Sequence, residues 1–283
     1  MQHSINVRSQ HQHSIQIYKI IDTSQVMSSK IILRPAQRSD ISDLALLGNA
    51  ANANSVLHRR IAPSQDQSPV GHYQWRRNLV RLRFPAPDIR TIVAVNSSSG
   101  ELLGQATWAI EGSDTALYKK WTGESTWADW LENKLISIER TWSRYFSDEF
   151  IDYRFLDQFL AAFTGNQRAQ RPACLHCHLI VVKPDIQSKG VGRMLIDWGK
   201  ELAVKEELPL FLESNLEATG FYDKIGFSRM NKDVVVSPDG QDSICIPAYV
   251  WEGKEREGRW LERDMEFDGE GERWKWKDAV LPK

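Results

Sequence analysis

The 283-residue chain lacks a long apolar run, an excess of charge of one sign and a cysteine framework. No apolar segment approaches the ~18 consecutive residues of a membrane-spanning helix, so we expect no membrane partner. The formal net charge of −1 gives no general attraction for nucleic acid, and any anion-binding site must therefore be local. Three cysteines form an odd set and no secretory signal is recognisable, so we expect a reducing, cytoplasmic setting rather than a disulfide-linked fold.

What the chain does contain is ordinary globular material with many tryptophans. Hydrophobic residues make up 41% of the chain and charged residues 26%, which allows a sizeable core. Of the eleven tryptophans, four lie between Trp121 and Trp142. That local concentration bears on what the protein binds.

Short apolar runs and turn residues predict alternating strands and helices in the first part of the chain. We expect residues 1–28, rich in Gln, His and Ser, to form an N-terminal arm, and residues 29–251 to form one domain. Ser39 or Asp40 can cap a helix after the first strand. The expected elements are strands at 31–36, 91–95 and 102–110, and helices after residue 40 and at about 72–82.

Residues 111–170 are predicted to form a helical insertion. Thr126 and Asp129 have the spacing of a helix cap, and apolar residues recur every three or four positions in 127–145 and again in 155–163. Two interpretations remain open. The apolar stripes pack on the sheet, or they also wall a pocket for a substrate.

The second half of the chain again alternates between strands and helices. A C-terminal extension at 252–283 is densely charged but contains three tryptophans, so we expect it to pack on the domain. The expected elements are strands at 174–182, 209–213, 227–236 and 244–251, and helices at 190–206 and 216–225.

The residues between strand 174–182 and the next helix favour an anion-binding loop. The run from Gln187 to Gly192 reads Gln-Ser-Lys-Gly-Val-Gly, and glycines let backbone N–H groups approach an anion without an obstructing Cβ. Lys189 and Arg193 add positive charge. The glycine patterns of dinucleotide-binding and Walker loops are both missing. An ordinary turn before a helix is the alternative.

Three segments together resemble the GNAT family of N-acetyltransferases: the loop Gln187–Gly192 with its Q-x-x-G-x-G spacing, the segment Phe221–Phe227 with Y-x-x-x-G-F, and the opening Arg34–Asp40. The resemblance implies a mixed α/β sheet of six or seven strands flanked by helices, to which the insertion and the extension are additions. It also implies transfer of an acetyl group from acetyl-CoA to an amine by direct attack. The long insertion and the tryptophan-bearing tail resemble fungal members of the family.

The resemblance assigns the acyl-donor site residue by residue. It implies that the strand before the loop binds pantetheine through the backbone of Ile180, Val181 and Val182. Asn215 and Phe221 are further candidates beside the donor. The residues implied to bind the diphosphate are Gln187, Ser188, Lys189, Gly190, Val191, Gly192 and Arg193.

Proton transfer needs a base for the attacking amine and an acid for the leaving thiolate. His176 matches the position where histone acetyltransferases of the family carry a glutamate, and His178 on the same strand face is a competitor. Glu213 is a weaker alternative. Tyr222 matches the tyrosine that points at the CoA sulfur in the family, and a phenol there can protonate the thiolate. A structural role is the alternative for each residue.

Cys174, His176 and His178 share one strand face and raise the question of zinc. Side chains at i, i+2 and i+4 extend along ~13 Å of strand, too far for bonds of ~2 Å to one ion. We therefore predict no metal site.

The tryptophan-rich insertion favours a small, partly apolar amine as the acceptor, because no acidic or basic run for docking a protein is evident. Two functions of other classes remain as alternatives: an acyl-CoA-binding module without catalysis, and a scaffold that binds a protein partner. The oligomeric state is not predicted.

Overall fold

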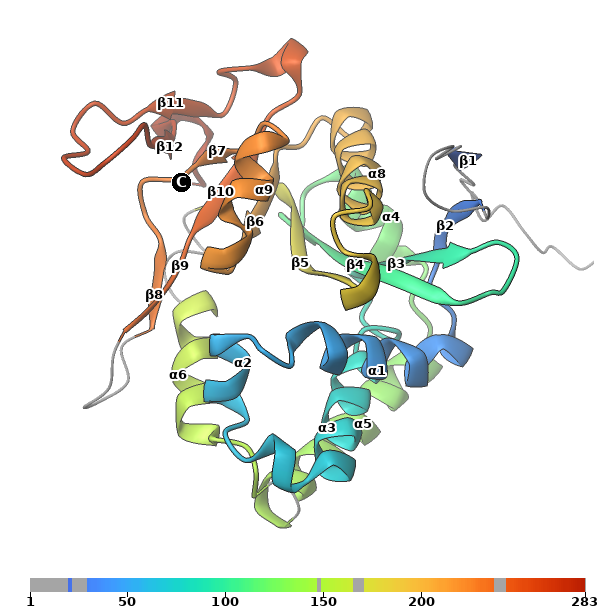
Figure 1. Ribbon diagram of the computed structural model, residues 1–283. Helices are drawn as coiled ribbons and strands as arrows, with labels where there is room; N and C mark the ends of the chain where they lie inside the picture. The colour runs from blue at the N-terminus through green and yellow to red at the C-terminus, as the bar shows by residue number, and fades with distance from the viewer. Residues whose placement is uncertain (1–19, 22–29, 147–148, 165–170, 237–242, 283) are drawn as a thin grey trace, which may run out of the picture.

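A computed structural model describes residues 20–21, 30–146, 149–164, 171–236 and 243–282 (Figure 1). Its centre is an eight-stranded sheet in the order β1-β2-β3-β4-β5-β6-β10-β7, in which β5 and β6 are parallel and the other described neighbours antiparallel. The strands are β1 (Ile20–Ile21), β2 (Ile31–Pro35), β3 (Ile89–Asn96), β4 (Leu102–Glu111), β5 (Cys174–Val182), β6 (Leu210–Glu213), β10 (Ala248–Trp251) and β7 (Ser228–Arg229). The predicted mixed α/β fold is confirmed, since seven strands remain beside the two-residue edge strand β1. Most of the predicted N-terminal arm lies outside the described residues.

One face of the sheet is covered by α8 (Val191–Lys205), α4 (Ala116–Gly123) and α9 (Thr219–Lys224), which share a large apolar core with it. The contact between α8 and β4 is very close. A Cβ at Gly199 of α8 would lie 2.2 Å from the ring of Trp108, so this helix reaches the sheet only because residue 199 has no side chain.

The other face carries α1 (Ile41–Asn52) and α3 (Pro69–Arg81), whose apolar residues pack on β3. Asp40 precedes α1, and its carboxylate accepts hydrogen bonds from the Gln37 N–H at 2.7 Å and from the Arg34 guanidinium at 2.7 and 2.9 Å. Beyond this layer lie α2, α5 and α6, seen at the bottom of Figure 1. They span Val56–Ile61, Trp127–Phe146 and Tyr153–Thr164.

Two predicted strands are wrong in extent. The chain turns after β7, where Arg229 and Asp233 form an ion pair at 2.8 Å, and the next strand β8 (Val234–Val236) leaves the main sheet. It pairs with β9 (Ile244–Ile246) and packs on α6. Pro247, which has no N–H for a ladder, separates β9 from β10. The helix α2 was not predicted.

In the extension, β11 (Leu261–Arg263) pairs with β12 (Trp274–Trp276). Leu261 is buried against Phe211 of β6, and Trp274 and Trp276 pack at the same cluster. No helix in the described part of the chain is long and apolar enough to cross a membrane.

The described residues of the insertion are largely helical, as predicted, but the predicted burial of its first apolar stripe on the sheet is wrong. In α5, whose residues are all described, only Ile136 is buried. The helix turns polar residues toward the protein, where Glu132 and Glu139 form ion pairs with Arg38 and Arg81. Its apolar residues consequently face solvent.

Candidate active site

The parallel pair β5 and β6 separates part-way along the sheet. Their register runs from Leu175 opposite Leu210 to Cys177 opposite Leu212, and β5 then continues to Val182 beside β4 alone. The residues that follow this last rung, His178 on β5 and Glu213 on β6, therefore lie at the mouth of an open fork.

The fork exposes backbone groups of β5. Lys183 donates its N–H to the carbonyl of Leu103 on the β4 side at 2.9 Å. Because an antiparallel ladder alternates, the N–H and C=O groups of Ile180 and Val182 point to the opposite, open edge, while those of Val181 point to β4.

The glycine loop continues from this open edge. The Gln187 side-chain amide donates to the carbonyl of Val182 at 3.2 Å. Ser188 and Gly190 both have left-handed backbone, with φ of 62° and 89°, which only glycine adopts at no cost. The first hydrogen bond inside α8 joins the Met194 N–H to the Gly190 carbonyl at 3.0 Å. The N–H groups of residues 191–193 are therefore not used inside the helix and suit an anion.

Charge and apolar surface border the same loop. Lys189 and Arg193 are exposed, and a Cβ at Gly192 would lie 3.6 Å from Val182 and 3.8 Å from Phe221. The loop, the end of β5 and the ring of Phe221 thus converge. Asn215 is exposed at the end of the segment after β6.

Tyr222 is buried in the core beside the fork. Its ring lies 5.6 Å from the rings of both Phe227 and Tyr249, and 5.1 Å from that of Phe221. Burial raises the pKa of the Tyr222 phenol far above its usual range, so the group stays protonated. It can act as a proton donor but not as a base near neutral pH.

His176 bridges two buried carboxylates. Its Nδ1 lies 2.8 Å from Glu111 Oε1, and its Nε2 lies 2.6 Å from Glu213 Oε2. The Arg171 guanidinium lies 3.5 Å from Glu111 and 3.4 Å from Glu213, and it stacks on Phe211 at 4.2 Å. The side chains of all four charged residues are less than a tenth exposed.

These contacts set the protonation of His176. Burial alone would lower its pKa, but Glu213 and Glu111 outweigh burial and raise the pKa above the ordinary value. Carboxylates only accept hydrogen bonds, so both ring nitrogens donate and the ring is an imidazolium. It has no free lone pair with which to accept a proton from an amine.

His178 is exposed and differs sharply from His176. In the described register between β4 and β5, Cys177 is opposite Trp108 and Leu179 is opposite Thr107, which leaves His178 as the extra residue of a β-bulge. Such bulges re-aim a side chain. The rings of His178 and His176 meet edge to face with centroids 4.3 Å apart.

Glu111 was not among the metal ligands considered from the sequence, but it lies near His176 and His178. One ligand atom from each of Glu111, His176 and His178 lies within 4.8 Å of the others, a trio that the spacing argument on Cys174 did not consider. A cation bound by one ring nitrogen of His176 would replace one of its two hydrogen bonds, and the other nitrogen could still donate to a carboxylate. In the described structure both ring nitrogens lie within hydrogen-bond distance of carboxylates instead.

Sequence analysis missed Glu111 and Arg171. Glu111 ends a strand whose ten residues are all buried, and the antiparallel register places it opposite Cys174. A charged residue at the end of a mostly apolar strand was a usable signal. Arg171 precedes β5 outside any predicted element and offered none.

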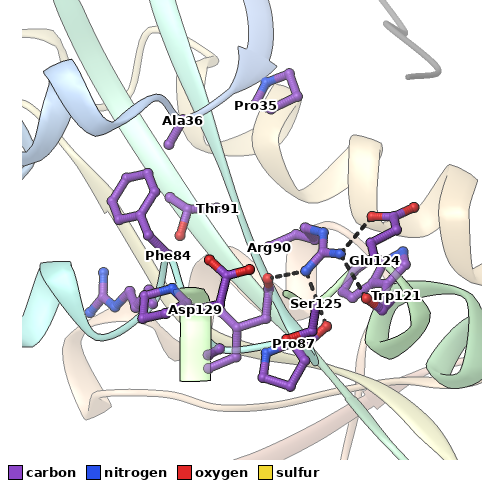
Figure 2. A pocket seen from close by; sticks show the side chains of 14 residues that line it. Pro35, Ala36, Phe84, Pro87, Arg90, Thr91, Trp121, Glu124, Ser125 and Asp129 are labelled. Carbon is purple, nitrogen blue, oxygen red and sulfur yellow. Dashed lines mark hydrogen bonds and ion pairs between the residues drawn. The ribbon is translucent and has the colours of Figure 1, made fainter. Parts of the chain in front are cut away.

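A cavity of about 260 Å³ lies between residues 83–91 and residues 121–129 of the insertion (Figure 2). Arg90 points into its wall, bound to Glu124 at 2.8 Å and to the Trp121 carbonyl at 3.2 Å. The insertion does line a cavity here, with Trp121, Glu124, Ser125 and Asp129, although the exposed stripe of α5 does not.

One comparison with known proteins matches part of the chain to a protein family. Residues 115–227, which include β5, the glycine loop, α8, β6 and α9, match the acetyltransferase (GNAT) family. These residues, less than half of the chain, form a GNAT-family region. The predicted resemblance is therefore confirmed.

Individual relatives are more distant. A "Probable acyltransferase SID5" of Ajellomyces capsulatus is 36% identical over 53 residues, which is 19% of this chain and 39% of the relative. The chain thus spans well under half of that curated relative.

Two solved structures illustrate the range of likeness. The histone acetyltransferase HPA2 and related acetyltransferase structure from Corynebacterium glutamicum has 18% identity and a TM-score of 0.43, covering 76% of this chain and 93% of that one. The polyamine N-acetyltransferase of Drosophila melanogaster, which forms N-acetylagmatine, has 11% identity and a TM-score of 0.44, covering 79% of this chain and 100% of that one.

Proposed function

We propose that this GNAT-family chain transfers an acetyl group from acetyl-CoA to a small-molecule amine by direct attack in a ternary complex. The observation that carries the proposal is the continuous surface formed by the open edge of β5 and the left-handed loop before α8. One edge offers backbone hydrogen bonds in a row, and the other end offers unused N–H groups with positive charge. Acyl-CoA carries a pantetheine arm that can use the backbone hydrogen bonds, followed by a diphosphate that can use the N–H groups and the positive charge.

In the proposed complex, the diphosphate binds the N–H groups of residues 191–193, with Lys189 and Arg193 adding charge. The pantetheine arm takes the backbone groups of Ile180 and Val182, while Phe221 contacts its apolar part. Val181, Gln187 and Ser188 support this surface, and Asn215 lies at the far side of the fork.

The proposed chemistry uses the exposed and the buried side of the fork differently. The amine nitrogen attacks the thioester carbonyl, and the C–S bond breaks as the amide forms. His178, the exposed imidazole, accepts the proton that the ammonium loses. Tyr222 stays protonated because it is buried, and it gives its proton to the departing thiolate. His176 and Glu213 position the fork rather than accept the proton.

The acceptor is proposed to lie on the sheet face that leads to the cavity in Figure 2. Thr91, which lines that cavity, hydrogen-bonds Thr107 at 3.2 Å, and Thr107 pairs with Leu179 beside His178. Thr91 on β3 and Leu179 on β5 are two strand spacings apart, a distance of ~10 Å. A small amine with an apolar tail spans that distance.

Residues 29–251 are proposed as the catalytic domain, with 111–170 as an insertion and 252–283 as an extension packed on it. A cytoplasmic setting, which supplies acetyl-CoA and reduced thiols, suits the three free cysteines.

Calorimetric titration of acetyl-CoA tests the donor site. We expect saturable binding by the native chain and at least tenfold weaker binding by Gly190→Glu, a loss of about 1.4 kcal/mol or more. The matched control is Gly100→Glu, because Gly100 also has positive φ, 75°, and open space around it, but lies in the β3–β4 hairpin. Equal loss in both variants, or no binding by the native chain, would contradict the proposed site.

Turnover with a panel of amines tests the proton-transfer roles. Tyr222→Phe should lower kcat at nearly unchanged acetyl-CoA affinity, and His178→Gln should remove the rise of kcat/KM with pH. If the native chain binds acetyl-CoA but acetylates no amine in the panel, a binding module without catalysis becomes the better function.

A further inference from the structure

The helix α5 is amphipathic, but its polar face is the one that faces the protein. Glu132 pairs with Arg38 at 2.6 Å and Glu139 pairs with Arg81 at 2.7 Å, on either side of the buried Ile136. A helix of a globular protein normally turns its apolar stripe to the core. This inversion leaves the apolar stripe without a covering element among the described residues.

We call these outward apolar residues the outer stripe: Trp127, Leu131, Leu135, Ile138, Trp142 and Tyr145, of which 40–78% of each is exposed. From Leu131 onward they are spaced by 4, 3, 4 and 3 residues, the repeat of a helix that packs along another helix. The Trp142 ring also packs against the Phe146 ring at a tilt, with centroids 4.3 Å apart, so part of the surface is already ordered.

A lipid surface is the less suitable partner for the outer stripe. Asp129, Glu132 and Glu139 balance Lys134, Arg140 and Arg144 along α5, which leaves no net charge on the helix. Helices that lie on anionic membranes carry an excess of Lys and Arg. The heptad spacing instead indicates a second helix.

The area of the outer stripe fits a protein interface. Fully burying one aromatic side chain removes 150–250 Å² from water, so the exposed parts of the stripe's aromatic and aliphatic residues together offer about 800 Å². A stable interface of standard size buries about that much on each partner. Most stable oligomers of one chain are two-fold symmetric, and the same patch then serves both copies.

We propose that the protein is a homodimer in which α5 pairs antiparallel with α5 of a second copy. The stripe maps onto itself when the helix is reversed about its centre. Leu135 then lies opposite Ile138 of the other copy, and Leu131 opposite Trp142. Aliphatic residues meet at the centre, and aromatic residues cover both ends.

Sedimentation velocity of the full chain tests the dimer. We expect a dimer for the native chain at micromolar concentration and a monomer for Ile138→Glu, which places two carboxylates near the two-fold axis. The matched control is Leu46→Glu on α1, since Leu46 is an exposed helical leucine outside the stripe, 55% exposed, and this variant should stay dimeric. Because Ile138 is 67% exposed, its variant should keep the native circular dichroism and melting temperature.

A charge swap tests the register. The double variant Leu135→Lys with Ile138→Glu places lysine opposite glutamate twice in the antiparallel pair and should restore the dimer. In a parallel pair, lysine would face lysine, and the double variant would stay monomeric, which would overturn the arrangement. A native chain that sediments as a monomer overturns the dimer itself, and its co-sedimentation with phosphatidylcholine vesicles would assign the stripe to a lipid surface.

Discussion

Replacing His176 by glutamine removes the positive charge that joins two buried carboxylates. The native imidazolium donates to Glu111 at 2.8 Å and to Glu213 at 2.6 Å. Glutamine can donate to one of them but cannot neutralise either, and Arg171 alone then faces two negative charges. Removing one member of a buried charge pair costs about 3–5 kcal/mol. Since one hydrogen bond can persist, we expect a loss near the lower end, about 3 kcal/mol in the free energy of unfolding.

The size of this loss must depend on pH in one direction. The pKa of His176 is raised in the folded chain, so the folded state keeps its proton at pH values where the unfolded chain has lost it. Stabilisation by the imidazolium is fully present below pH ~6.5, the unfolded value, and is lost as pH rises through the folded pKa. The difference between native chain and variant should therefore be largest near pH 6 and should shrink by up to about 1.4 kcal/mol per pH unit above that.

Urea unfolding followed by circular dichroism at pH 6 to 9.5 measures this difference. His178→Gln is the matched control, because it makes the same substitution two residues away on an exposed side chain and should cost about 0.5 kcal/mol or less at every pH. A His176→Gln loss that stays constant across the pH range would refute the imidazolium. The same two variants also distinguish the proposed roles in turnover, since only His178→Gln should remove the proposed base.

Two further predictions concern stability away from the fork. His58 and His72 are buried with their Nε2 atoms 2.8 Å apart, and burial together with a nearby arginine lowers their pKa values to about 3 and about 4. The free energy of unfolding should therefore be highest above pH ~6.5 and fall by about 2 kcal/mol at pH 5, after allowing for partial solvation. Urea titrations measure this fall, and His58→Gln should reduce it. Gly199→Ala should destabilise by about 1–3 kcal/mol because its Cβ would meet Trp108 at 2.2 Å, whereas Gly123→Ala, with open space at a helix end, should be neutral or slightly stabilising in the same melting experiment.

The sequence predicted best where local pattern and burial agree. The strand 174–182 matches β5 residue for residue, and the helix predicted at 190–206 differs from α8 by one residue at each end. There, a continuous apolar run is followed by a glycine loop and a 3.6-residue repeat, and the sheet buries what the pattern marks as apolar. The loop's left-handed residues were likewise signalled by glycine, except Ser188, whose positive φ has no such signal.

Prediction failed where the partner of a segment decides its structure. The periodicity of α5 correctly indicated a helix with one apolar face, but periodicity says nothing about which way that face points. The direction is seen only in the structure, where Glu132 and Glu139 pair with the distant residues Arg38 and Arg81. In the same way, β8 has a strand sequence but pairs outside the main sheet.

Two histidines two residues apart, His176 and His178, have different environments, and we propose different roles for them. The two hydrogen bonds of His176 connect β5 to β4 through Glu111 and β5 to β6 through Glu213, so it ties three strands together one residue before the last rung of the β5–β6 pair. Two residues later, in the β-bulge, His178 is exposed at the mouth of the fork. The buried histidine can fix where β5 and β6 part only if it remains charged, and a group that must stay protonated cannot also serve as the base. We propose the exposed histidine for the proton transfer because it lies at the mouth of the fork.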